Sequence, residues 1–579
     1  MIKAENFSYS FPQKDLYDNI SFSLEEGQHC AFIGTSGSGK STLVNILMNP
    51  DNYMYDGSLE IAPNSRIGYV SQFSQLDSDT PLTVFEYIGE KFIHFQKEIA
   101  SICTEMETAT DLEPLLEQYQ LVLDAYDAIG GDDYESIIRK NLNLADLIHQ
   151  ENQLVSNLSG GEFKLVQVIK EMLTQPDLLI MDEPDVFLDF EHLNSLRDLI
   201  NSHKGIILVI THNRYLLNHC FNKILHLENK ELQEFNGDYI DYHFSLLMQK
   251  IELQELAVAD EEEIQRNEEI INQLRNVAST HFEAARGKTL NARVKIRERL
   301  EARKIKAPFV YIKQPEISLT TDFPLETSPI VSVNNLSISF DDLLLDNINF
   351  EINATDKIAL IGENGTGKTT LLKAIYKNQN PAIVLDPQVK LGLLSQIQGE
   401  MLTETNTIFE EFFELGFQTR DEIISYANNY GFEEDILHQK IELLSGGEKN
   451  MLQLAKLSLS NANLLLLDEP TSHLDTYSQL ALEDAISKYN GAVLMISHDF
   501  YSIANCVDYV LIIENKTIRK VSMRKFRKII YAHHFDQNYL AFEEKKKNIE
   551  TKIALALNST NFALAKELSV ELEKLLLQR

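Results

Sequence analysis

The feature that most constrains this chain is an internal repeat of four short motifs. The first copy reads GTSGSGKST at 34–42, LSGGE at 158–162, LLIMDEP at 178–184 and ITHNRY at 210–215. The second copy reads GENGTGKTT at 362–370, LSGGE at 444–448, LLLLDEP at 464–470 and ISHDFY at 496–501. The distance from Ser159 to Ser445 is 286 residues, and it is the same from Glu183 to Glu469. Motifs that recur in one register indicate a duplicated module.

Both copies alternate short apolar, β-branched runs with amphipathic stretches. The runs in the first copy are CAFIG, RIGYV, LLIMD and IILVIT, and those in the second are IALIG, LGLLS, LLLLD and AVLMIS. This alternation predicts two α/β modules, each with a largely parallel sheet. The stretch from Gln72 to Ser159 is 38 residues longer than the equivalent stretch from Gln396 to Ser445, and it includes an acidic region around 98–135.

The segment between the copies predicts a helical hairpin. Residues 238–307 contain no proline and a single glycine, Gly287. Two long helices that turn near Gly287 are the simplest prediction. We expect domain boundaries at 1–242 for the first module, 243–330 for the linker, 331–535 for the second module and 536–579 for a C-terminal extension. The extension is expected to form two amphipathic helices that join at 558–561.

Charge is divided unevenly along this linker. Its first part is acidic, whereas residues 286–306 carry nine basic and two acidic side chains, a net +7 in a chain whose net charge is −35. Folding the sequence about Gly287 places Arg293 opposite His281 and Arg297 opposite Val277, so the acidic block falls further down the stem. A basic tip that contacts a polyanion is therefore predicted. The alternative is a solvated face in which acid and base neutralise each other.

Composition and charge argue against several other classes of protein. The overall charge of −35 opposes indiscriminate nucleic-acid binding, so any polyanion contact must be local. No apolar run approaches the roughly 18 residues that a bilayer crossing needs, and the N-terminus has no signal-peptide pattern. The four cysteines are scattered without a CxxC pair, which disfavours a disulfide or metal framework. A cytoplasmic location is expected.

The GxxxxGK[ST] pattern in each copy predicts a loop that wraps phosphate groups. Its glycines let main-chain N–H groups point inward, and the following helix directs its positive end at the phosphates. Lys40 and Lys368 would neutralise the β- and γ-phosphates, while Ser41 and Thr369 offer hydroxyls to Mg²⁺. The loop residues expected to bind the nucleotide are Gly34, Thr35, Ser36, Gly37, Ser38, Gly39, Lys40, Ser41 and Thr42, and Gly362, Glu363, Asn364, Gly365, Thr366, Gly367, Lys368, Thr369 and Thr370.

Acidic side chains at the ends of two apolar strands predict the metal and the base. Asp182 and Asp468 would hold Mg²⁺. Glu183 and Glu469 follow them directly and would polarise the attacking water. Three further pairs recur in the repeat. Gln72 and Gln396 are expected to reach both metal and water, and His212 and His498 to contact the γ-phosphate. Phe11 and Phe340 are candidates to stack on adenine, although core packing would explain them equally well.

The LSGGE segments predict how the two copies cooperate. Each begins a helix, so its serine hydroxyl and N–H groups form an anion site. Because each copy already has its own phosphate loop, we expect each segment to close over the nucleotide of the other copy. The residues concerned are Ser159, Gly160 and Gly161, and Ser445, Gly446 and Gly447.

Together and in this order, these motifs resemble those of ATP-binding cassette domains. Two cassettes that are joined by a charged helical linker resemble the ABC-F family of ribosome-associated ATPases, over nearly the whole chain. The resemblance implies two P-loop cassettes in tandem, a helical hairpin linker and a short C-terminal helical extension. It also implies a monomer that sandwiches two ATP, with Mg²⁺, head to tail between its cassettes. Hydrolysis would release the protein from the ribosome, and the linker (about 275–306) would approach rRNA and P-site tRNA through the ribosomal E site.

Carried over residue by residue, the resemblance joins the Lys40 site to Ser445, Gly447 and Asp475, and the Lys368 site to Ser159, Gly161 and Asp189. The sequence also departs from the family pattern. No arginine follows either LSGGE, residues 185–189 read DVFLD where 471–475 read TSHLD, and the first copy has THN where the second has SHD. These differences predict unequal hydrolysis at the two sites.

Two other functional classes share some of these features. A tandem ATPase subunit of a membrane importer also lacks transmembrane helices, but it needs no basic hairpin between its cassettes. A DNA-repair ATPase would carry zinc-binding cysteines or a very long coiled coil. A translation factor is therefore the preferred interpretation, and no transmembrane partner is expected. The sequence leaves open whether the role is housekeeping or antibiotic resistance.

Overall fold

The computed structural model describes two compact units. The described residues are 2–11, 14–63, 65–72, 81–109, 111–186, 188–278, 295–296, 314–322, 325, 329–339, 343–395, 401–417, 419–534 and 537–578. Unit 1 comprises 1–238 and 314–529, and unit 2 comprises 239–313 and 530–579. We call the first part of unit 1 cassette 1 and its second part cassette 2.

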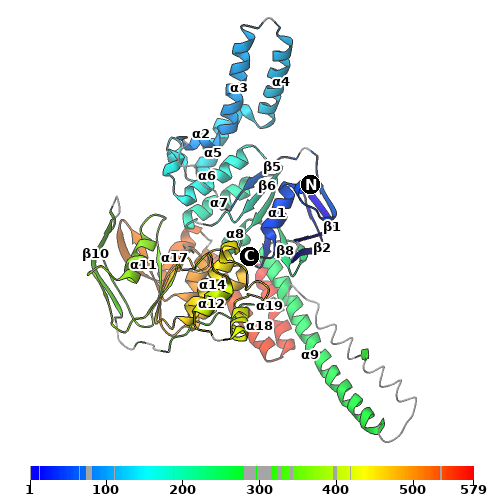
Figure 1. The fold of residues 1–579 in the computed structure, drawn as a ribbon, viewed down its shortest axis with the longest axis vertical. Coiled ribbons are helices and arrows are strands. Elements are labelled where there is room, and N and C mark those ends of the chain that lie inside the picture. The colour runs from blue at the N-terminus through cyan, green and yellow to red at the C-terminus, as the bar shows by residue number, and fades with distance from the viewer. Residues whose placement is uncertain are drawn as a thin grey trace. The chain divides into compact units, whose positions relative to one another are not determined.

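Cassette 1 is built on two sheets and a set of helices (Figure 1). Its strands are β1 (Ile2–Phe11), β2 (Lys14–Leu24), β3 (His29–Gly34), β4 (Asp56–Ile61), β5 (Ile67–Val70), β6 (Leu178–Asp182), β7 (Ile206–Ile210), β8 (Lys223–Glu228) and β9 (Glu231–Asn236). Its helices are α1 (Lys40–Met48), α2 (Val84–Ile88), α3 (Glu90–Met106), α4 (Glu113–Ala128), α5 (Tyr134–Leu144), α6 (Gly160–Leu173), α7 (Phe190–Ser202) and α8 (Arg214–His219). The larger sheet has the order β5-β6-β7-β3-β8-β9, and the smaller one β2-β1-β4.

Cassette 2 repeats this arrangement. Its strands are β10 (Val331–Ser339), β11 (Leu343–Ile352), β12 (Lys357–Ile361), β13 (Ile383–Leu385), β14 (Leu391–Leu394), β15 (Leu464–Asp468), β16 (Ala492–Ile496), β17 (Tyr509–Glu514) and β18 (Thr517–Ser522). Its helices are α11 (Lys368–Lys377), α12 (Ile408–Glu414), α13 (Arg420–Asn429), α14 (Gly446–Leu459), α15 (Thr476–Lys488), α16 (Phe500–Cys506) and the first part of α17 (Met523–His534), whose residues from 530 onward belong to unit 2. Its sheets have the orders β14-β15-β16-β12-β17-β18 and β11-β10-β13. The predicted fold class, tandem α/β modules with largely parallel sheets, is confirmed.

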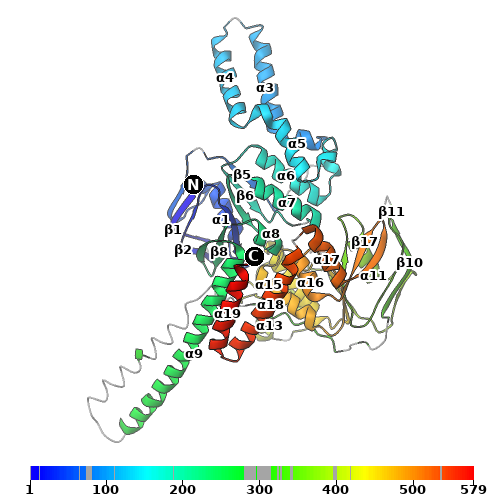
Figure 2. The same cartoon turned by 180° about the vertical axis from the view of Figure 1, so that it is seen from behind.

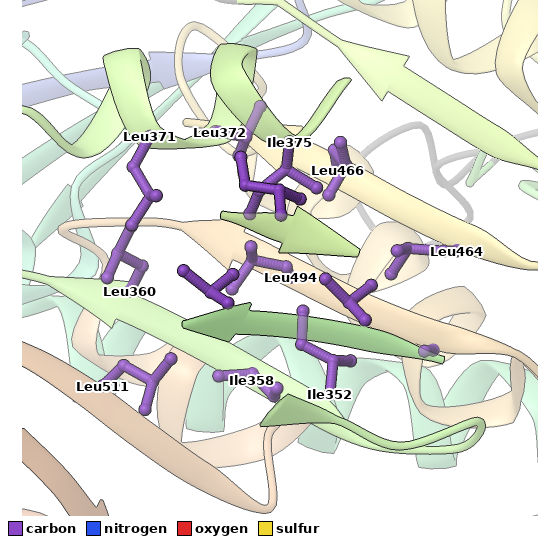
Figure 3. Packing of buried hydrophobic residues seen from close by; sticks show 14 of the residues in the cluster. Ile352, Ile358, Leu360, Leu371, Leu372, Ile375, Leu464, Leu466, Leu494 and Leu511 are labelled. Atoms are coloured by element: carbon purple, nitrogen blue, oxygen red, sulfur yellow. The ribbon is translucent and has the colours of Figure 1, made fainter. Parts of the chain in front are cut away.

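The core of cassette 2 explains why its strands read as continuous apolar runs. All five positions of β12, β15 and β16 are buried, because both faces of the parallel sheet are covered. Leu371, Leu372 and Ile375 of α11 are fully buried and point toward these strands (Figure 3). Burying one such side chain contributes roughly 1.5–3 kcal/mol. This packing fixes the start of α11, which the phosphate loop precedes.

The extra residues of the first copy form a helical hairpin. Helices α3, of 17 residues, and α4, of 16 residues, lie side by side and extend beyond α5 (Figures 1 and 2). Phe92 of α3 stacks on Tyr134 of α5, with ring centroids 4.9 Å apart, so the base of the hairpin is anchored in the cassette.

Unit 2 contains the linker helix and the C-terminal helices. Helix α9 (Tyr239–Ala278) has 40 residues, and α18 (Gln537–Asn558) and α19 (Phe562–Leu576) share a core with it. Its fully buried members include Ile251 of α9 and Ile553 of α18. The predicted second linker helix lies outside the described residues, as does the basic segment 286–306 except Lys295 and Ile296. Among the helices that the structure describes, none is long and apolar enough for a membrane span.

Candidate functional site

The two phosphate loops share one local geometry. Strand β3 ends at Gly34 and α1 begins at Lys40; β12 ends at Ile361 and α11 begins at Lys368. The residues before these helices, Gly39 and Gly367, have φ of 103° and 94°, a conformation that glycine adopts at little cost. The Lys40 ammonium donates to the carbonyls of Gly34 (2.8 Å) and Thr35. Each curled loop directs the N–H groups at the start of the following helix toward the space that the loop encloses, where they can bind an anionic group.

Each phosphate loop borders a cavity that residues of both cassettes line. The first cavity, about 630 Å³, is lined by the predicted residues Phe11, Ser36, Gly37, Gly39, Lys40, Ser41, Thr42, Gln72, Glu183, His212, Ser445, Gly446 and Gly447. The second, about 550 Å³, is lined by Ser159, Gly160, Gly161, Asn364, Gly365, Gly367, Lys368, Thr369, Thr370, Asp468, Glu469 and His498, and also by Glu183 and His212, which border both cavities. We call these the first and second sites. Both volumes fall in the range of small-molecule pockets.

The remaining predicted residues are placed as follows. Gly34, Thr35 and Ser38 of cassette 1 and Gly362, Glu363 and Thr366 of cassette 2 belong to the two phosphate loops without lining these cavities. Asp182 ends β6 and is buried. Phe340 and Gln396 lie outside the described residues.

Direct contacts cross from each cassette to the phosphate loop of the other. The Ser36 N–H donates to Asp475 Oδ2 at 3.3 Å, and the Asn364 N–H donates to Asp189 Oδ2 at 3.4 Å. Asp475 and Asp189 end residues 471–475 and 185–189, which we call the D-loops. A Cβ added to Gly447 would stand 2.5 Å from Ser36 Oγ, so the LSGGE helix of cassette 2 closely approaches the first phosphate loop.

The donor set beside each loop fits magnesium. Thr369 Oγ1 donates to Asp468 Oδ1 at 3.3 Å, and Ser41 likewise hydrogen-bonds Asp182. Burial raises the pKa of Asp182 to about 6, so a nearby cation would stabilise the ionised form of this carboxyl. In nucleotide-binding proteins, Mg²⁺ is usually bound by one or two protein side chains, and the phosphates of the nucleotide supply further ligands. The carboxylate and the hydroxyl beside each loop match this pattern.

Comparisons with known proteins agree with this geometry. The family model described as "ABC transporter" matches residues 17–186 and 345–472. The chain is 30% identical to the uncharacterized ABC transporter ATP-binding protein YfmM of Bacillus subtilis, over 86% of this chain and 96% of that protein. It is 29% identical to ABC transporter F family member 2 of Arabidopsis thaliana, over 88% of this chain and 76% of that protein. The chain belongs to the ABC-F family.

A solved structure shares the fold of this ABC-F protein. It is an archaeal ribosome recycling factor, aABCE1, in complex with the archaeal ribosomal stalk protein aP1. The likeness has a TM-score of 0.51 with 17% identity and covers 91% of this chain and 92% of that one. Like the cassettes of its family, the ABC-F chain binds and hydrolyses ATP.

The two glutamates that follow the strand-end aspartates differ in their surroundings. Burial disfavours the charged form of Glu183, but the hydrogen bond from His473 and the positive electrostatic contributions of His473, His212 and Lys40 together outweigh burial and hold the pKa of Glu183 below its ordinary value. At the second site, burial raises the pKa of Glu469 to about 7, and the carboxylate of Asp468 adds to this shift. The ABC-F sites are therefore chemically unequal, in a direction that keeps Glu183 ionised.

The strand-end histidines of both sites are neutral. Burial lowers the pKa of His212 to about 4 and that of His498 to about 3, and Lys40 and Lys368 respectively add to the effect. A neutral imidazole offers one donor and one acceptor nitrogen. Either histidine can therefore donate one hydrogen bond to a phosphate oxygen without adding charge.

Sequence reasoning missed three residues of the ABC-F sites. His473 contacts Glu183 from the other cassette. Glu448 of cassette 2 lies close to Gly37 of the first phosphate loop, since a Cβ added to Gly37 would stand 2.9 Å from the Glu448 carboxylate. Lys164 donates to the Gln72 carbonyl at 3.0 Å. For two of the three, the aligned copies of the repeat carried a signal: His473 aligns with Phe187 and Lys164 with Asn450, whereas Glu448 aligns with the identical Glu162. At the first two pairs of positions the two copies carry different chemical groups.

The close approach at Gly447 gives a steric prediction. In Gly447→Ala, the new Cβ would lie 2.5 Å from Ser36 Oγ of cassette 1 and 2.6 Å from the His473 carbonyl of its own cassette, so both the contact with the first phosphate loop and the D-loop of cassette 2 must shift. Such overpacking costs about 1–3 kcal/mol, and we expect ATP hydrolysis to fall about tenfold. The control is Gly160→Ala in the other LSGGE segment, where a Cβ meets nothing within 4 Å, and its loss should be smaller. Equal losses in steady-state phosphate release would contradict the prediction.

Proposed function

We propose that this ABC-F protein is a ribosome-associated translation ATPase of the cytoplasm. ATP and Mg²⁺ bind at both sites and hold the cassettes together, which is the form that engages the ribosome, and hydrolysis lets the protein leave. The linker contacts rRNA and P-site tRNA from the ribosomal E site through residues about 275–306. The basic segment within a strongly acidic chain is the observation that carries the ribosomal part of the proposal.

The composite sites support the closing step. Each phosphate loop meets the LSGGE helix and the D-loop aspartate of the other cassette, so a bound nucleotide would contact both cassettes at once. A ligand that binds one arrangement better than another shifts the protein toward it. Lys40 and Lys368 would neutralise phosphate charge, Ser41, Asp182, Thr369 and Asp468 would hold the metal, and Glu183 and Glu469 would take the proton of the attacking water.

Charge supports the ribosomal partner. Net charge is −35 overall but +7 within 286–306, so attraction to a polyanion is confined to one segment. The fold is also that of a protein described as an archaeal ribosome recycling factor. A role as the ATPase subunit of a membrane importer would leave the basic segment without a use.

Co-sedimentation tests the proposal. The double variant Glu183→Gln, Glu469→Gln keeps the shape of both sites but removes both bases, and we expect it to pellet with ribosomes when ATP is present. Adding Lys40→Ala and Lys368→Ala should abolish this retention, because the phosphates lose their neutralising charge. Recovery with membranes and a permease instead of ribosomes would favour the importer.

A second arm of the experiment tests the basic segment. Arg293→Gln with Arg297→Gln should weaken ribosome binding and make its dependence on salt less steep, by roughly one unit of logarithmic slope for each phosphate that the segment no longer neutralises. The control is Arg519→Gln, which removes a half-exposed arginine of cassette 2. If the salt dependence of the linker variant equals that of its parent, the segment does not contact the polyanion.

A further inference from the structure

His473 connects the D-loop of cassette 2 to the general base of cassette 1. Its Nδ1 lies 2.9 Å from Glu183 Oε2, and both side chains are largely buried. Gln72 Nε2 donates to the same carboxylate oxygen at 2.6 Å. Two donors from different cassettes therefore converge on one oxygen of Glu183.

Several contacts within cassette 2 hold His473 in this position. Its φ of 61° is left-handed, which is costly for a residue with a side chain and requires support from its surroundings. Asn450 of α14 supplies part of it, since its Nδ2 donates to the carbonyls of Ser472 (2.9 Å) and Pro470. A Cβ on Gly446 would stand 3.1 Å from the His473 ring, so the glycine leaves room for the imidazole.

The sequence of the other site has no counterpart of this histidine. In the 286-residue register, His473 corresponds to Phe187, whose ring cannot donate a hydrogen bond, and Asn450 corresponds to Lys164. Lys164 donates instead to the Ser71 and Gln72 carbonyls. The carboxylate of Glu469 receives a backbone N–H from His498 of its own cassette, at 3.3 Å.

We propose that His473 is a positioning residue for ATP hydrolysis at the first site: it donates Nδ1–H across the cassette interface to Glu183 and fixes the orientation of that carboxylate. The histidine takes no part in making or breaking bonds. Because the donor belongs to the other cassette, the base of the first site is complete only when the cassettes are closed. The inference rests on the proposed role of Glu183 as base. It predicts that the first site hydrolyses ATP faster than the second.

The test isolates each site in turn with the full chain. In a Glu469→Gln background only Glu183 can act as base, and in a Glu183→Gln background only Glu469 can. His473→Phe, which copies the residue of the other D-loop, should lower kcat about 10- to 100-fold in the first background, as expected when a charged group loses a hydrogen bond. The KM for ATP should stay within about twofold, because ground-state binding is retained. The decrease in the second background should be at least about fivefold smaller.

A conservative variant separates positioning from folding. His473→Gln restores an N–H donor and should recover part of the lost kcat. Equal decreases in both backgrounds, or an effect that appears in KM instead of kcat, would overturn the proposal. So would a Glu469→Gln parent whose turnover does not exceed that of the double variant, since Glu183 would then not be a base. These assays need no ribosomes, so the ribosomal proposal stands or falls separately in the co-sedimentation experiment.

Discussion

Replacing Glu183 and Glu469 together by glutamine is expected to lower ATP hydrolysis by about 10²- to 10⁴-fold, the usual cost of losing a general base. Each glutamate follows a buried strand and has a left-handed backbone, with φ of 45° and 49°. Their N–H groups donate to the carbonyls of Ile210 and Ile496 on neighbouring strands, which fixes the turn. This strained turn places each carboxyl in a cavity with a phosphate loop.

ATP binding should survive in the double variant, because glutamine matches glutamate in size and hydrogen-bonding reach. The measurements are phosphate release at saturating ATP and equilibrium binding of a fluorescent nucleotide. Glu514→Gln is the matched control, since that side chain lies on β17 in a half-exposed pair with Arg519 and should leave the rate unaltered. A double variant that keeps more than about a tenth of the parental rate would remove both glutamates from the proposed role.

The fold was predictable because its determinants are local. Apolar runs such as IALIG and LLLLD became β12 and β15, and the phosphate loops stand between a strand and a helix as the motif requires. The predicted joint of the C-terminal helices at 558–561 also agrees with α18 ending at Asn558 and α19 beginning at Phe562. Each of these predictions needed only neighbouring residues.

The contacts between the cassettes were harder to predict because they join distant residues. That each LSGGE segment faces the other copy followed from counting phosphate loops, but the partner of Glu183 did not. His473 lies 290 positions from Glu183, and its contact depends on a left-handed backbone and on room left by Gly446. Similarly, the motifs gave no reason to pair Arg214 with cassette 2. Such pairs depend on how two folded surfaces meet.

Arg214 gives the other large expected effect. It begins α8 in cassette 1, is largely buried, and pairs with Glu483 and with Asp499 (2.8 Å) of cassette 2. Its guanidinium also lies 4.9 Å from the Tyr501 ring centroid. Burial disfavours its charge, but the two carboxylates outweigh this and raise the pKa of Arg214 above its ordinary value. The arginine therefore remains charged, and it compensates two acids of the other cassette, of which Glu483 is buried and Asp499 is partly exposed.

Arg214→Ala should open the cassettes, because the buried Glu483 and the partly exposed Asp499 would otherwise lose their counter-charge in the closed form. Breaking a buried pair costs about 3–5 kcal/mol, which corresponds to a shift of roughly 10²- to 10⁴-fold toward the open form. The measurement is the radius of gyration by small-angle X-ray scattering with saturating ATP, in the Glu183→Gln, Glu469→Gln background, which is expected to retain nucleotide. Arg214→Lys keeps the charge but loses the planar fork, so its shift should be intermediate. Arg519→Ala, at a half-exposed pair worth at most about 1 kcal/mol, should not open the protein. If Arg214→Ala and Arg519→Ala behave alike, the buried pair does not hold the cassettes together.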